Sequence, residues 1–268
     1  MNRTDKSWLK SGMQALGFLA ALILVMSTSA VQGSDDKALE IMKEVQRRAL
    51  TDSQSYEGAI DVVDAKGKVL NKHWHYYREG NRGNSKVLVR FDAPPEVRGV
   101  GLLTLNHAGK HSEQWIYTPA IQRDRRIAPQ EKSQRFMGTD FTNEDMEDRA
   151  IEDYDYSLIG EESFAGQLCY KIKAVYKDRS NSQYEKLQVW VRKDIIATTY
   201  AEFYIEGKLS KTLKWEDWEQ IQYIWTPHFV EMRDLLRKST TRIRSSNIKY
   251  NLKFEPDWFT LRNLRRAP

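Results

Sequence analysis

Most of the chain after residue 50 is divided into short segments that have the pattern of β-strands joined by tight turns. These segments are rich in Val, Ile, Tyr, Trp and Thr, and Gly, Asn and Asp separate them. The clearest hairpin turns at Asp64 to Gly67. Connections of about two to five residues join antiparallel neighbours, because parallel strands need a much longer crossover. The sequence therefore predicts a mainly β-fold of about eleven to twelve antiparallel strands.

A sheet of this size has to curl or close, because open twisted sheets rarely exceed about ten strands. Large apolar groups occupy both faces of some predicted strands, as where Trp190 stands between Val189 and Val191, so both faces need cover. We predict an incompletely closed antiparallel barrel. From Asp35 to Leu50, apolar residues recur at three- and four-residue spacing, which predicts an amphipathic helix that covers a mouth or a face. The many aromatic residues could fill the interior or line a cavity, and composition leaves both open.

The first thirty residues have the order of a secretory signal peptide. Basic residues precede an apolar run, Ala15 to Met26, and small residues follow it up to Ala30. This run is too short for an uncleaved anchor, because a spanning helix needs roughly twenty apolar residues. We expect cleavage after Ala30, with Gly33 as the alternative site. The remaining residues, 31–268, are expected to form a single exported domain.

Charge and motifs argue against several other classes of protein. Removing the signal segment, with three basic residues and one acidic residue, lowers the net charge from +5 to +3, which is no nucleic-acid signature. His73 and His75 alternate with Trp74, so both imidazoles face one side of a strand and could bind a metal with a carboxylate. No third ligand lies at a recognisable spacing, and no nucleophile elbow is present. We therefore predict no metal, no cofactor and no enzyme activity.

The stretch from Arg125 to Asp148 interrupts the strand pattern. Its cations come first and its carboxylates last, with Phe-Met-Gly-Thr-Asp-Phe between them. One interpretation is a solvated loop whose two halves pair electrostatically, with a helical turn started by Thr142 and Asp145 in capping-box spacing. Long segments without strand pattern are, however, commonly lids or binding loops. We expect short lid helices here, with Phe136 and Phe141 facing inward and the charges facing water or a partner.

Three motifs in this region carry a family resemblance. In order, "DAPPEVRGVGLLTL", "EQWIYTPAIQRDRRI" and "RFMGTDFTNEDM" resemble the core of the outer-membrane lipoprotein-sorting, LolA-like, family of Gram-negative exported proteins. The resemblance is strongest from about Phe91 to Gly160. It implies an unclosed antiparallel barrel in the periplasm, covered by helices, with an apolar cavity that receives acyl chains. It also implies a membrane transporter of the resistance-nodulation-division (RND) type or an outer-membrane acceptor as partner, and brings no catalytic residues.

These observations predict a periplasmic carrier that shields the acyl chains of a lipoprotein or lipid on the way to the outer membrane. The alternative is a periplasmic sensor of the same fold that reports lipid or mislocalised lipoprotein to a membrane partner. The candidate lipid-binding residues are apolar and mostly aromatic: Trp74, Tyr76, Trp115, Tyr117, Phe136, Phe141, Trp190, Phe203 and Ile205. The candidate partner-docking residues are charged: Arg123, Arg125, Arg126, Asp140, Glu144 and Asp145.

Overall fold

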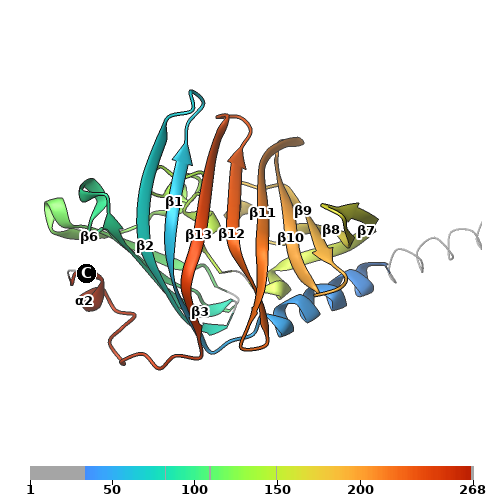
Figure 1. Ribbon diagram of the computed structural model, residues 1–268, viewed down its shortest axis with the longest axis horizontal. Helices are drawn as coiled ribbons and strands as arrows, with labels where there is room; N and C mark the ends of the chain where they lie inside the picture. Colours follow the sequence, from blue (N-terminus) through green and yellow to red (C-terminus); the bar gives the residue numbers. More distant parts are fainter. Residues whose placement is uncertain (1–33, 82, 109, 149, 267–268) are drawn as a thin grey trace, which may run out of the picture.

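One large antiparallel sheet dominates the computed structural model, which describes residues 34–81, 83–108, 110–148 and 150–266 (Figure 1). The predicted signal peptide lies outside the described residues. No helix in the described part of the chain is both long and apolar enough to cross a membrane. The sheet contains thirteen strands: β1 (Ser53–Val63), β2 (Val69–Asn81), β3 (Asn84–Ala93), β4 (Gly101–Leu105), β5 (Glu113–Thr118), β6 (Arg123–Arg126), β7 (Tyr154–Phe164), β8 (Gln167–Tyr176), β9 (Lys186–Arg192), β10 (Ala197–Ile205), β11 (Lys208–Ile221), β12 (Ile224–Asp234) and β13 (Ser239–Tyr250).

The strand order leaves the barrel open at one place. The order is β6-β5-β4-β3-β2-β1-β13-β12-β11-β10-β9-β8-β7, and β1 pairs with β13 in an antiparallel register in the middle of the sheet. Strands β6 and β7, which follow one another in the chain, are the two edges. The connection between them, residues 127–153, therefore has to span from one edge of the sheet to the other. The predicted incompletely closed antiparallel fold is confirmed.

The sheet has one more strand than the upper end of the predicted range. Residues 123–126, which were not predicted to be a strand, form β6 and pair with β5. Their sequence, Arg-Asp-Arg-Arg, has no alternation of apolar and polar residues that would mark a strand. Charged side chains are typical of an edge strand, because they discourage pairing with another chain.

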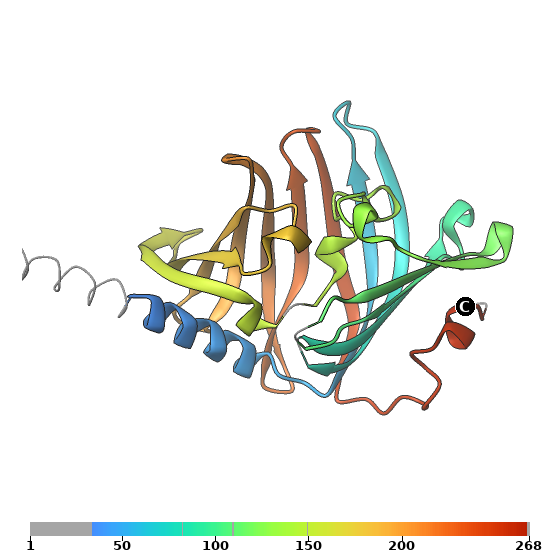
Figure 2. The ribbon, with the colours of Figure 1, turned by 180° about the vertical axis from the view of Figure 1, so that it is seen from behind.

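The N-terminal helix spans residues 34–48 in the described part of the chain, close to the predicted range. It lies against the side of the sheet seen in Figure 2. Its first described residue, Ser34, donates a hydrogen bond from Oγ to the main-chain oxygen of Leu158 on β7 at 2.9 Å. The apolar stripe formed by Ala38, Met42 and Val45 is buried in the main hydrophobic core. Burial of this stripe is the reason an otherwise charged helix stays on the sheet.

Residues 127–153, which we call the lid, run across the same side of the sheet (Figure 2). The predicted short lid helices are single 3₁₀ turns at Pro129–Glu131, Phe136–Gly138, Glu144–Met146 and Ile151–Asp153. Phe136 and Phe141 are 1% and 9% exposed and belong to the main core, so they face inward as expected. The two halves of the stretch also pair, through Lys132 with Glu147 at 2.9 Å and Arg135 with Asp140 at 3.0 Å.

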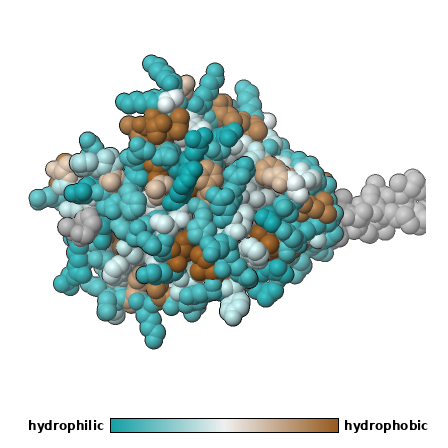
Figure 3. Space-filling view, viewed as in Figure 1, coloured by the Kyte–Doolittle hydropathy of each residue, from teal (hydrophilic) through white to brown (hydrophobic). Residues whose placement is uncertain are grey.

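A smaller core lies on the opposite, outer face of the sheet. Leu88 and Leu103 are buried there beneath the C-terminal segment, which includes the short helix α2 (Leu261–Leu264). Arg265 pairs with Asp124 of β6 at 2.7 Å, so the basic C-terminal segment rests on the fold. Elsewhere hydrophilic side chains cover most of the face shown in Figure 3. The lid side and the outer face therefore differ in what covers them.

Candidate functional site

The interior between the sheet, the N-terminal helix and the lid is partly hollow. Two adjoining cavities have volumes of about 410 and 420 Å³, and Phe141, Leu213 and Trp215 contribute to the walls of both. Each volume lies within the range of about 300 to 1,000 Å³ that is typical of small-molecule sites. Composition left open whether the aromatic residues fill the interior or line a cavity. The structure contains cavities within a packed core.

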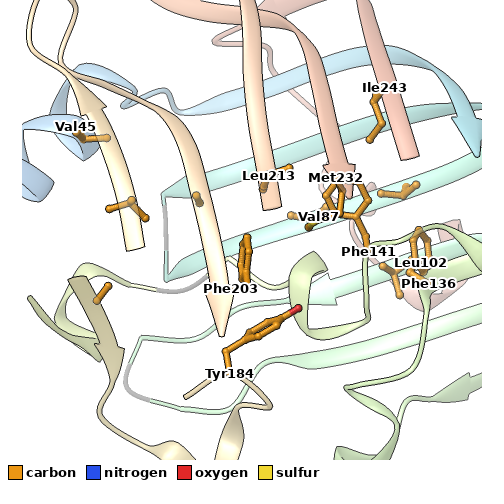
Figure 4. Close-up of a cluster of buried hydrophobic side chains, with 14 of the residues drawn as sticks. Val45, Val87, Leu102, Phe136, Phe141, Tyr184, Phe203, Leu213, Met232 and Ile243 are labelled. Atoms are coloured by element: carbon orange, nitrogen blue, oxygen red, sulfur yellow. The ribbon is translucent and has the colours of Figure 1, made fainter. Parts of the chain in front are cut away.

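The first cavity has a mainly apolar wall built from three parts of the chain. The N-terminal helix contributes Met42 and Val45, the lid contributes Phe141, and several strands supply the rest of the wall. Figure 4 shows Val45, Phe203, Leu213 and Met232 directed toward a common interior. The strand residues lining this cavity include Tyr156, Ala174, Leu187, Val189, Ala201, Phe203, Leu213 and Met232. Such a wall favours hydrocarbon over water, because burying apolar surface is the main source of affinity there.

The wall of the second cavity includes a group of aromatic residues on β1 and β2. Tyr56 and Tyr76 stack with ring centroids 4.6 Å apart, and Trp74 lies deeper on the same face of β2. A Cβ at Gly58, the partner of Trp74 in β1, would come within 2.1 Å of the indole nitrogen. Glycine is therefore required for the indole to lie against β1. Burial raises the pKa of Tyr56 well above its ordinary value, so this phenol stays neutral beside the cavity.

Apolar side chains surround the end of the cavities next to the β11–β12 turn. Leu50, just after the N-terminal helix, is 53% exposed, and Trp225 at the start of β12 is 37% exposed. Both line the second cavity. Tyr223, in the turn itself, is 93% exposed. Exposed apolar groups next to a cavity mark the place where an apolar ligand would enter.

The structure places the nine candidate lipid-binding residues in four environments, of which three are on the inner side of the sheet. Phe136 is buried beneath the cavities, with its ring centroid 5.8 Å from that of Phe91. Ile205 packs against the edge of the main core. Four of the nine line the cavities: Trp74, Tyr76, Phe141 and Phe203.

Three of the candidates lie on the wrong face of the sheet to line a cavity. Trp115 and Tyr117 pack against the smaller core on the outer face. Trp190 lies between Val189 and Val191, which belong to the main core, so its own side chain points to the other face. Its indole nitrogen donates to Oε1 of Glu162 at 2.5 Å. Alternation along a strand defines two faces, and sequence does not tell which of them is inside.

Asp140 fastens the lid to the sheet. The side chain is fully buried, and its oxygens accept hydrogen bonds from the hydroxyls of Ser239 and Thr241 on β13 and from the Arg135 guanidinium at 3.0 Å. Its main-chain nitrogen donates to Oγ1 of Thr241 at 2.8 Å. A buried carboxylate needs such partners, because an unpaired one is costly to bury. These bonds join the middle of the lid to the centre of the sheet.

A second carboxylate extends this attachment. Asp145 accepts hydrogen bonds from the Lys211 ammonium on β11 at 3.1 Å and from the Tyr184 hydroxyl at 2.8 Å. It also completes the predicted capping box, since its Oδ2 accepts from the main-chain nitrogen of Thr142 and its own main-chain nitrogen donates to Oγ1 of Thr142 at 3.3 Å. Lys211 is 5% exposed, and nothing in the local sequence marks it as buried.

The expected exposure of three docking candidates is therefore wrong. The carboxylates of Asp140 and Asp145 accept hydrogen bonds from side chains of the sheet. Glu144, 5% exposed, accepts hydrogen bonds from Ser182 and Gln183. The run of carboxylates has the composition of a solvated loop, but donors from the sheet and from the β8–β9 connection bond three of them in the interior. The other three candidates, Arg123, Arg125 and Arg126, are exposed on β6. Their assignment to partner docking stays a prediction.

Tyr184 makes the stability of this attachment sensitive to alkaline pH. Burial, together with the neighbouring Asp145, raises the pKa of Tyr184 well above its ordinary value of 10.0. The unfolded chain releases this proton near pH 10 and the folded chain keeps it, so stability falls as the pH rises from about 10 toward the higher folded-state pKa. Urea unfolding between pH 9 and 11 should show a shallower loss in Tyr184→Phe, by up to about 1.4 kcal/mol per pH unit. Parallel losses in the two proteins would contradict this expectation.

Comparison with known proteins shows what this chain is similar to. A family model described as "Uncharacterized protein" matches residues 83–266. A domain named for outer membrane lipoprotein sorting, from Vibrio parahaemolyticus, is 28% identical with a TM-score of 0.82, and the match covers 87% of this chain and 100% of that domain. A DUF1329 family protein from Desulfovibrio piger is 27% identical with a TM-score of 0.82, over 86% of this chain and 99% of that one.

A more distant solved structure has the same fold. A LolA superfamily protein from Nitrosomonas europaea is 22% identical with a TM-score of 0.68, and the match covers 84% of this chain and 98% of that one. At this identity the likeness shows the fold alone. No curated protein matches the chain.

Proposed function

The chain belongs to a LolA-like family, and from this premise we propose that it is a periplasmic carrier that shields acyl chains of a lipoprotein or lipid during transport toward the outer membrane. The observation that carries the proposal is the hollow, mainly apolar interior beneath a fastened lid. The predicted signal peptide and the name of the domain from Vibrio parahaemolyticus support the compartment and the class of cargo.

The cavity provides the free energy that a carrier needs. Each methylene moved from water into an apolar wall contributes about 0.8 kcal/mol, so twelve buried methylenes contribute about 10 kcal/mol before the costs of association. Phe203 and Leu213 supply such a wall, and Trp225 and Leu50 lie where a chain would enter. The charged head group would stay in water outside the entrance, because burying it unpaired is costly.

The exposed arginines of β6 suit an encounter with an acidic partner surface, which we propose to be an RND-type exporter or an outer-membrane acceptor. Arg125 pairs with Glu131 at 2.7 Å, and Arg126 lies 3.5 Å from Glu113. Exposed pairs of this kind add little stability, so the guanidinium groups can exchange these partners for others at low cost.

Reversing two of these charges should separate docking from lipid binding. In Arg125→Glu with Arg126→Glu, we expect transfer of a fluorescent lipid to acceptor membranes carrying the partner to slow by at least about tenfold at low salt, because rim charges act on the association rate. Lipid uptake by the isolated protein should stay unchanged. The matched control is Arg237→Glu with Lys238→Glu in the β12–β13 turn. Equal loss of uptake and transfer would assign these arginines a structural role in place of docking.

Native mass spectrometry with lipid extraction, on protein isolated from its natural envelope, tests the proposed function. We expect a bound lipid, and uptake of a fluorescent fatty acid by the delipidated protein. A protein that carries no lipid and takes up no fatty acid would overturn the proposal. Crosslinking in cells then separates the two lipid-binding roles: an exporter or outer-membrane acceptor supports the carrier, whereas a membrane signalling protein favours a sensor.

A further inference from the structure

Two histidines and an aspartate meet on the outer face of the sheet, away from the cavities. Nδ1 of His73 lies 2.7 Å from Oδ1 of Asp92, and Nε2 of His75 lies 3.0 Å from Oδ2 of the same carboxylate. One potential ligand atom from each residue lies within 4.8 Å of the other two. The three side chains are about one-third exposed, at 31%, 31% and 32%.

An irregularity in the sheet creates this cluster. His73 pairs with Ala93 and Trp74 pairs with Phe91, so Asp92 is the extra residue of a β-bulge between β2 and β3. A bulge turns the side chain of the extra residue and leaves its main chain outside the regular ladder. Phe91 points into the main core, so Asp92 points outward, on the face that His73 and His75 share. Local sequence did not indicate this third ligand, because Asp92 comes from a neighbouring strand.

The three side chains form the donor set of a borderline divalent metal ion. Imidazole suits Zn²⁺, Cu²⁺ and Ni²⁺, and two histidines with one carboxylate are the ligands of several open metal sites. Ca²⁺ and Mg²⁺ prefer oxygen ligands alone. We propose that His73, His75 and Asp92 bind a divalent transition-metal ion, with Zn²⁺ as the probe and water completing the coordination.

The three side chains have to adjust their positions to admit the ion. Zinc lies about 2.0 to 2.2 Å from nitrogen and oxygen ligands, which places the ligands of a tetrahedral site roughly 3.3 Å apart. The nitrogen-to-oxygen separations of 2.7 and 3.0 Å, which involve different oxygens of Asp92, have to widen by a few tenths of an ångström, and any separation in the cluster near its 4.8 Å limit has to shorten. The side chains, about one-third exposed on two neighbouring strands, can make this change by rotation, and solvent has access to the remaining coordination positions.

The surrounding charges leave the carboxylate available. Arg98 donates to the main-chain oxygen of Asp92 at 3.0 Å, and not to its carboxylate. Arg90, opposite His75 on β3, donates to the main-chain oxygen of Asn263 at 2.6 Å. Glu57, opposite His75 on β1, adds a negative charge on the other side. The positive charge of Arg90 on β3 is thus offset by the negative charge of Glu57 on β1.

Calorimetric titration of the EDTA-treated, dialysed protein with ZnCl₂ tests the proposal. We expect one ion per chain, and a dissociation constant raised at least about tenfold in Asp92→Asn and in His73→Ala with His75→Ala. Loss of even an outer hydrogen-bonding partner of a metal ligand costs about ten- to a hundredfold in affinity, so loss of a ligand should cost no less. Asp92→Asn keeps the side-chain shape, and its far-UV circular dichroism should match the parent.

The matched control is His228→Ala, which removes a histidine that is 30% exposed and paired with Glu219 at 3.1 Å. This change should leave zinc affinity unaltered. Absence of zinc binding by the parent, or equal affinity in the parent and in Asp92→Asn, would overturn the proposal. Because the cluster faces away from the cavities, either result leaves lipid uptake, and so the proposed carrier function, to its own test.

Discussion

A phenylalanine in place of Ala174 should reduce the affinity for acyl chains by more than tenfold and leave the fold intact. Ala174 lies on β8, is 4% exposed, and lines the first cavity. The added ring would occupy space that the proposed ligand uses. Displacing as few as two methylenes from the cavity costs about 1.6 kcal/mol, which is more than a tenfold change in affinity. Titration with a fluorescent fatty acid measures this loss.

The control for this variant is Lys173→Phe, one residue earlier on the same strand. Its side chain points to the opposite face, so the same ring should leave uptake unchanged. Overpacking a core lowers the free energy of unfolding by about 1 to 3 kcal/mol, whereas a ring that enters an existing cavity should lower it less. Urea unfolding of Ala174→Phe distinguishes these two cases. Undiminished uptake in a folded Ala174→Phe protein would show that acyl chains do not enter the first cavity.

Replacing Asp140 by alanine should destabilise the protein by about 2 to 4 kcal/mol, because each buried polar group left without its partner costs about 1 to 3 kcal/mol. The change leaves the hydroxyls of Ser239 and Thr241 and the Arg135 guanidinium without their shared acceptor. The lid would also lose its attachment to the centre of the sheet. Urea unfolding measures the first effect, and hydrogen exchange of residues 127–148 measures the second.

Two further variants make this result specific. Asp140→Asn keeps one acceptor oxygen and should lose less stability than the alanine variant. Asp155→Ala removes a carboxylate that is 74% exposed and 3.9 Å from Lys177, so it should change stability by less than about 1 kcal/mol. If Asp140→Ala and Asp155→Ala were equally mild, Asp140 would not be the anchor of the lid.

The lid shows where prediction from local sequence worked and where it stopped. The capping box between Thr142 and Asp145 and the inward orientation of Phe136 follow from residue type and short spacing, and both are present. The burial of Asp140 does not follow from such features, because its partners on β13 are about a hundred positions away, with Thr241 separated from it by 101. The residues next to a carboxylate in the sequence do not show whether its hydrogen-bond donors come from a distant strand or from water.

The cavity shows the same division. Strand alternation correctly placed His73 and His75 on one face and set Trp190 against Val189 and Val191. The choice of inner face depends on the curvature of the whole sheet and on what the C-terminal segment covers. For this reason Trp115 and Tyr117, as aromatic as the true lining residues, lie on the outside.

By itself, the sequence determined the antiparallel β-fold, the N-terminal helix, the hairpins and the family, because these depend on periodicity, turn residues and motifs within short stretches of chain. Only the tertiary structure decided that β6 forms one edge of the sheet, that Asp140 lies inside, that Asp92 meets two histidines, and that the interior is hollow. Each of these results depends on strands that are distant in the chain becoming neighbours, and on the curvature that sets how much space remains between the sheet and its cover.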